Sequence, residues 1–211
     1  MFVTASSQIL PETRERVCQL QLISIAWMSL EAVLSLWAAW RARSPALMAF
    51  GGDSAIELLS AVVVLWRFRH PGSEPAEHNA ARIAAGLLVA LATYVVLLSA
   101  LSLLGYLEPL PSFLGMAVLL AAACVMPFLA RQKRRLSALT ASAALRADAA
   151  QSAACAYLSI IGLAGLAVHA FGRIPAADPL AALAITPFLA FEAREALRGK
   201  PCGCSAPRLG G

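Results

Sequence analysis

The chain has 211 residues, of which 60% are hydrophobic and only 14% are charged, and its mean hydropathy is +0.72. Soluble domains use about half apolar and about a quarter charged residues, so this composition excludes an ordinary soluble domain. The net charge of +5 is unevenly distributed, as expected for a membrane topology signal, and it therefore requires no nucleic-acid partner.

Apolar stretches of membrane-spanning length follow one another along the chain. Runs of about 18 or more apolar residues are typical of transmembrane helices. The sequence predicts six such helices, over residues 17–40, 46–66, 80–104, 112–130, 145–171 and 179–197. We therefore expect an all-α membrane protein with a polar N-terminal segment (1–16), a membrane domain (17–199) and a short tail (200–211). The polar N-terminus does not resemble a signal peptide, so the first span is expected to be retained.

Basic residues in and beside the segments that connect the spans are concentrated on one side of the bilayer. Thirteen of them flank the spans on the side of both termini, against three on the opposite side, which are Arg41, Arg43 and Arg173. The positive-inside rule then places both termini in the cytosol, in agreement with an even number of spans. Residues 67–79 are expected to form a cytosolic loop. The basic run 131–135 is interpreted as a topology signal between the fourth and fifth spans.

Acidic residues lie within the apolar spans. Asp53 and Glu57 are four residues apart, so they share one face of the second predicted helix. Ionised acids at membrane depth are costly and usually mark an ion or proton path, whereas the alternative is pairing with a basic partner for assembly alone. Glu31 lies in the middle of the first span and has the same two interpretations, an accessory transport role or charge pairing.

The second and fifth spans resemble each other. Residues 46–55 and 144–153 align without gaps and share five identities, an alignment that pairs Asp53 with Gln151 and Glu57 with Cys155. Transporters built from internal repeats commonly place their site where the repeats meet near the midplane. Asp148 lies one turn before Gln151. Either it is an additional ligand, or it pairs with Arg146 or another basic group near the cytosolic mouth.

The segments 44–57 and 144–155 resemble the cation diffusion facilitator family, in particular a small bacterial branch similar to the transmembrane protein 163 type. The motifs are DSxIE at 53–57 and DAxQSxxC at 148–155. The resemblance implies a six-helix antiporter that exports zinc and related divalent cations, forms homodimers and resides in the bacterial inner membrane. It also implies paired metal ligands on the second and fifth helices. The family commonly adds a cytosolic metal-binding domain, which the tail is expected to be too short to hold.

In the family pattern Gln151 stands where a histidine is usual, and Cys155 where an aspartate is usual. The predicted ligands are Asp53, Glu57, Gln151 and Cys155, with Asp148 as a fifth candidate. Zinc accepts carboxylate oxygen and thiolate sulfur readily, while glutamine is a weak ligand. Sulfur also suits cadmium, and the carboxylates admit cobalt, manganese or iron. Ligands must lose their protons to bind metal, which predicts exchange of metal against protons.

Cysteines also occur in the tail, where Cys202 and Cys204 form a CxC pair. Such a pair could hold a soft metal transiently but cannot by itself complete a tetrahedral site.

These patterns predict a secondary active transporter for a divalent metal ion, with zinc the first candidate, working by alternating access in the lipid bilayer. The alternative is a membrane metal-binding sensor or partner-binding protein that does not transport. An enzyme is disfavoured because the three histidines are scattered and no nucleophile–base set is present.

Overall fold

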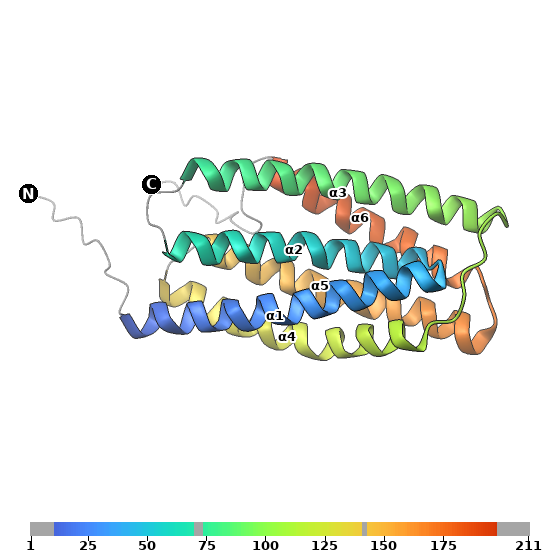
Figure 1. The fold of residues 1–211 in the computed structure, drawn as a ribbon, viewed down its shortest axis with the longest axis horizontal. Coiled ribbons are helices and arrows are strands. Elements are labelled where there is room, and N and C mark those ends of the chain that lie inside the picture. The colour runs from blue at the N-terminus through green and yellow to red at the C-terminus, as the bar shows by residue number, and fades with distance from the viewer. Residues whose placement is uncertain (1–10, 70–73, 141–142, 198–211) are drawn as a thin grey trace, which may run out of the picture.

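The computed structural model describes residues 11–69, 74–140 and 143–197, and within them it contains six α-helices and no strand. The helices lie alongside one another along the long axis of a bundle (Figure 1). Their bounds are α1 Pro11–Ala42, α2 Pro45–Arg69, α3 Glu74–Leu103, α4 Phe113–Thr140, α5 Ala143–Gly172 and α6 Ala177–Leu197. The predicted all-α architecture with six helices in this order is confirmed.

Five of these helices are long and apolar enough to cross a membrane, and α6 is not among them. The reason is charge, because every 18-residue stretch of α6 holds at least three charged residues, from the set Asp178, Glu192, Arg194 and Glu195. It nevertheless lies lengthwise in the bundle and packs against α2, α3 and α5 (Figure 1). Its acids Asp178 and Glu192 are buried and half-buried, respectively, and acids that face the interior of a bundle are tolerated where lipid-facing ones are not.

Two segments expected to lie between spans are largely helical. Within 67–79, α2 continues to Arg69 and α3 begins at Glu74, so His78 belongs to a helix. The basic run 131–135 also lies inside a helix, since α4 continues to Thr140. The predicted span ends differ from the helix ends for one reason: hydropathy reports the thickness of the apolar layer, whereas residues such as Lys, Arg, Leu and Ala continue a helix well beyond it.

A tight connection joins α1 to α2. Arg43 adopts a left-handed conformation with φ 50°, and the Ser44 N–H donates to the Ala39 carbonyl at 3.1 Å, which closes the last turn of α1. Ser44 then caps α2, its hydroxyl accepting from the Leu47 N–H at 3.2 Å. The Asp178 carboxylate at the start of α6 accepts from the Ala46 N–H at 2.9 Å. The first turn of α2 is thereby fixed to both α1 and α6.

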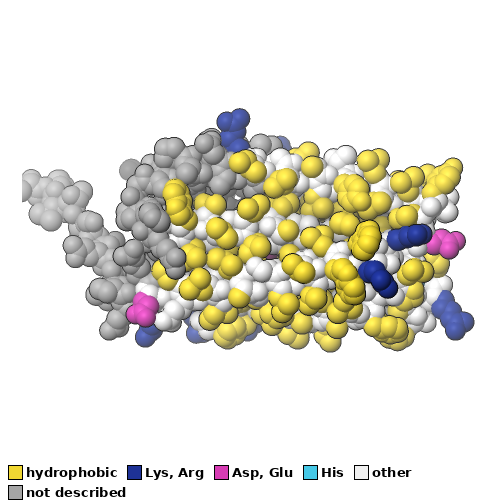
Figure 2. Space-filling view, in the orientation of Figure 1, with side chains coloured by type: hydrophobic (Ala, Val, Ile, Leu, Met, Phe, Trp, Pro, Cys, Tyr) yellow, Lys and Arg dark blue, Asp and Glu magenta, His cyan; other side chains and the backbone are white. Residues whose placement is uncertain are grey.

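Helix α2 is the centre of the bundle, since it packs against α1, α3, α5 and α6. Its residues Ala46, Leu47, Ala49 and Phe50 are fully buried. Large apolar side chains are instead exposed on the outside of the bundle, for example Val33, Leu97 and Phe128. Figure 2 shows them covering the middle of one face, with charged side chains toward its ends. This is the distribution expected of a surface that contacts lipid hydrocarbon.

Small residues allow α5 and α6 to approach closely. A Cβ added at Gly165 would overlap the Ala181 Cβ and lie 3.2 Å from the Ala177 carbonyl oxygen. Close backbone approach at glycine and alanine is typical of packing between membrane helices. Because α6 also contacts α2, this packing helps to set where the first turns of α6 lie relative to α2.

Gly165→Ala is expected to lower the free energy of unfolding by about 1–3 kcal/mol, because the added methyl group meets backbone and a fixed Cβ rather than a flexible side chain. The measurement is an unfolding titration in detergent. The matched control is Gly86→Ala in α3, where a Cβ would meet nothing within 4 Å and helix propensity favours alanine. Equal stability of the Gly165→Ala and Gly86→Ala proteins would contradict the close packing of α5 on α6.

Candidate metal site

Three side chains with metal-binding groups meet between α2 and α5. One ligand atom from each of Asp53, Glu57 and Cys155 lies within 4.8 Å of the others, and all three residues are buried. The spacing of four residues places both acids on the inner face of α2. Ligand atoms that share one tetrahedral zinc ion are roughly 3.3–3.7 Å apart, given the usual zinc–oxygen and zinc–sulfur bond lengths. A small contraction would therefore bring these three atoms onto one ion.

Glu57 has one carboxylate oxygen engaged and one free. Its Oε1 accepts a hydrogen bond from the Ser152 hydroxyl at 2.9 Å, while its Oε2 is buried and has no hydrogen-bond partner among the described residues. A buried carboxylate oxygen without a donor is costly, and in native proteins it calls for an explanation such as a bound ion. The geometry of Glu57 thus fits a residue that is held by one oxygen and coordinates through the other.

Glu31 of α1 lies beside this cluster. The Cys155 thiol donates to its Oε1 at 3.6 Å, and the Ser54 hydroxyl donates to the same oxygen at 2.7 Å. Its other oxygen accepts from the Trp27 indole N–H at 2.7 Å. A third acid, from a third helix, is therefore buried in contact with the thiol, in the neighbourhood expected of an accessory residue.

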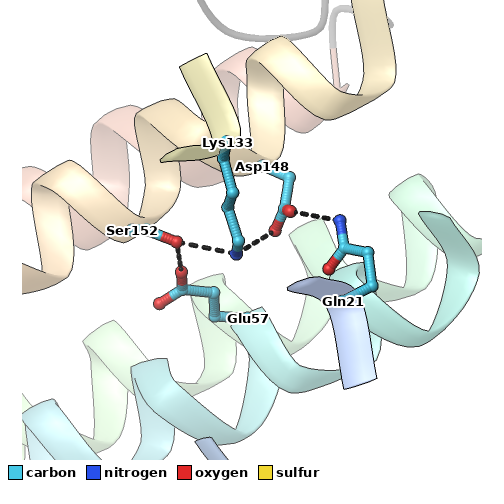
Figure 3. A network of polar contacts seen from close by, with 5 residues as sticks. All are labelled: Gln21, Glu57, Lys133, Asp148 and Ser152. Carbon is cyan, nitrogen blue, oxygen red and sulfur yellow. Dashed lines mark hydrogen bonds and ion pairs between the residues drawn. The ribbon is translucent and has the colours of Figure 1, made fainter. Parts of the chain in front are cut away.

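Asp148 does not belong to the three-ligand cluster. Figure 3 shows it between Lys133 of α4 and Gln21 of α1. Its Oδ1 forms an ion pair with the Lys133 ammonium at 3.0 Å, and its Oδ2 accepts from the Gln21 amide at 2.7 Å. Of the two interpretations of Asp148, the structure shows the pairing with a basic group.

The position of Lys133 differs from what was expected for the basic run 131–135. This lysine was interpreted as part of a topology signal between the fourth and fifth spans, yet its side chain is completely buried inside the bundle. Arg131, Arg134 and Arg135 of the same run are exposed. A helix turns by 100° per residue, so the four basic residues within 131–135 cannot all face the same way, and one of them here faces the core.

The remaining predicted site residues are Gln151, which the structure describes, and the two tail cysteines, which it does not. Gln151 is half-buried on α5, four residues before Cys155, and its part as a ligand stays a prediction. Cys202 and Cys204 lie outside the described residues.

Glu192 of α6 was missed by the sequence analysis. Its carboxyl group lies close enough to Asp53 to interact with it electrostatically, so α6 also contributes an acid at the edge of the cluster. The available signal was an acid within the predicted sixth span, similar to Glu31 in the first. Gln21 and Lys133 carried no such signal, because polar residues near the end of a span are ordinary.

The fold and the site together define a class: a multi-pass membrane protein with a buried cluster of carboxylate and thiol groups able to hold a cation. Comparison with protein families agrees, because residues 22–199 match the cation efflux transmembrane domain. The chain belongs to the cation efflux family, also called the cation diffusion facilitators, whose members transport divalent metal cations. Among curated proteins no match is found.

Lys133→Met is expected to destabilise the protein by about 3–5 kcal/mol, because it leaves the Asp148 carboxylate buried without its counter-charge. Lys133→Met combined with Asp148→Leu removes both charges and is expected to recover most of that loss. The measurement is the free energy of unfolding in a detergent titration. The exposed neighbour Arg134→Met serves as the control and should change it by less than about 0.5 kcal/mol. A Lys133→Met protein as stable as this control would contradict the buried ion pair.

Proposed function

We propose that this protein exports a divalent metal ion, most readily zinc, from the bacterial cytosol across the inner membrane, in exchange for protons. The observation that carries the proposal is the cluster of Asp53, Glu57 and Cys155, whose ligand atoms converge within 4.8 Å in the interior of an apolar bundle. Acids buried at membrane depth usually mark the path of an ion or a proton, which supports a transport role for this cluster.

The metal-binding set consists of these three residues, completed by Gln151 or by Glu31. Gln151 lies one turn from Cys155 on the same helix, while Glu31 already contacts the Cys155 thiol at 3.6 Å. Two carboxylates and a thiolate carry one negative charge more than a divalent ion neutralises. Protons therefore leave these groups when the ion binds and return when it departs, which couples metal movement to proton movement.

The position of the site suggests how the ion crosses the membrane. The site lies between α2 and α5, the two helices that share the internal sequence match, and α2 contacts four other helices. In transporters built from repeats, rocking of one part of the bundle against another exposes such a site to each side in turn. With the termini in the cytosol, as the basic residues indicate, the ion enters from the side where α1 and α5 begin. A homodimer, suggested by the family, is the proposed assembly.

Asp53→Ala combined with Glu57→Ala is expected to abolish zinc transport in proteoliposomes, since it removes two of the three converging ligands. The measurement is zinc flux driven by an imposed pH gradient. The control is Glu108→Ala, which removes an exposed acid in the connection between α3 and α4. Flux that survives the double substitution would remove these residues from the mechanism. Wild-type protein that binds zinc but moves none would instead support the sensor function.

Cys155→Ser is expected to weaken zinc and cadmium binding by at least about tenfold and manganese binding much less, because thiolate sulfur prefers the softer ions. The measurement is a competitive metal titration on the purified protein. Cys124→Ser is the matched control, since Cys124 lies exposed on the outside of α4. Equal losses for zinc and manganese would contradict coordination through the Cys155 sulfur.

A further inference from the structure

A buried lysine lies next to the metal site and is not explained by metal binding. Lys133 reaches inward from α4 and is fully buried. Its ammonium group is 3.0 Å from Asp148 Oδ1 and 2.9 Å from the Ser152 hydroxyl. Gln21 of α1 holds the second oxygen of Asp148 at 2.7 Å. The lysine is therefore fixed by α5 on two sides and, through Asp148, by α1 (Figure 3).

Ser152 connects this lysine to a proposed metal ligand. The hydroxyl has a single proton, which it donates to Glu57 Oε1 at 2.9 Å, and it accepts a hydrogen bond from Lys133. The three groups form a chain from ammonium to hydroxyl to carboxylate. Lys133 and Glu57 also interact electrostatically through space. Lys133 thus supplies positive charge to Glu57 in the absence of a metal ion.

The lysine lies on one particular side of the metal site. Asp148 precedes Cys155 by seven residues on α5, and Gln21 precedes Glu31 by ten residues on α1. At 1.5 Å per residue these partners of Lys133 are about 10–15 Å nearer to the end of the bundle where α1 and α5 begin. Figure 1 shows both helices beginning at the same end. An ion that enters from that end meets the Lys133 layer before it reaches Asp53, Glu57 and Cys155.

We infer that Lys133 is a tethered cation that closes this side of the metal site and competes with the metal ion for the negative charge of Glu57. The inference rests on the proposed function, because it takes Glu57 as a metal ligand. A divalent ion at Glu57 repels the ammonium group, which must withdraw from Ser152 while Asp148 keeps it neutralised. Its return to Ser152 restores a positive charge beside Glu57 and so favours release of the ion. Lys133 is a positioning residue that tunes affinity and does not itself coordinate.

The test compares two variants that change the charge beside Glu57 in opposite directions. Asp148→Asn leaves Lys133 without its partner, so more of its charge acts on Glu57 and zinc binding should weaken by at least about tenfold. Lys133→Gln combined with Asp148→Asn removes the competing charge, and zinc binding should become at least about tenfold tighter than in the wild type. The measurement is a zinc titration of the purified full chain in lipid nanodiscs, with cobalt as a spectroscopic probe.

Arg134→Gln is the matched control, because it removes a neighbouring positive charge that is exposed on the same helix. It should leave zinc affinity unchanged. Opposite shifts in the two test variants support the inference, since a purely structural role would weaken binding in both. Shifts in the same direction, or no shift, would overturn it. Failure of the proposed function is distinguishable, because the wild type would then show no zinc binding that depends on Asp53 and Glu57.

Discussion

The structure depends on the balance of charge inside an apolar bundle. Asp53, Glu57, Glu31 and Asp148 are each no more than 4% exposed, and buried carboxylates are tolerated only where donors or positive charges meet them. Asp148 has Lys133 and Gln21, and Glu31 has Trp27 and Ser54. Asp53 and Glu57 lie with the Cys155 thiol, and although Ser152 donates to one oxygen of Glu57, its other oxygen has no partner among the described residues. Asp148 thus belongs to a structural ion pair, whereas Asp53 and Glu57 form the proposed site for a mobile cation.

The metal cluster and the Lys133–Asp148 pair lie at different depths in the bundle because of how the helices are positioned. The connection between α1 and α2 and the contact of Asp178 with Ala46 fix the start of α2. The acids of α2 consequently lie at one level, next to Cys155 of α5, while Asp148 lies nearly two turns away on the same α5 face. Ser152 lies between the two levels and contacts both. A single hydroxyl group therefore links the structural ion pair to the proposed transport site.

Much of this arrangement was predictable from the sequence, and the exceptions have a common cause. Hydropathy predicts the six helices, and spacing predicts the shared face of Asp53 and Glu57. Cys155 alone would be an ordinary small packing residue, and only the internal match to α2 singles it out. Lys133, Glu192 and Gln21 were not predicted, because their importance lies in contacts between helices. Gln21 and Asp148 are 127 residues apart, and no local pattern reports such a pairing.

The central claim is that a metal ion binds between Asp53, Glu57 and Cys155. Anomalous X-ray diffraction at the zinc edge, on crystals of the zinc-loaded protein, tests it most directly. The account predicts a single strong anomalous peak within about 2.0–2.4 Å of the Cys155 sulfur and of a carboxylate oxygen from α2, which disappears in crystals of the Asp53→Ala protein. A zinc peak elsewhere in the bundle, or one that persists unchanged without Asp53, would contradict it.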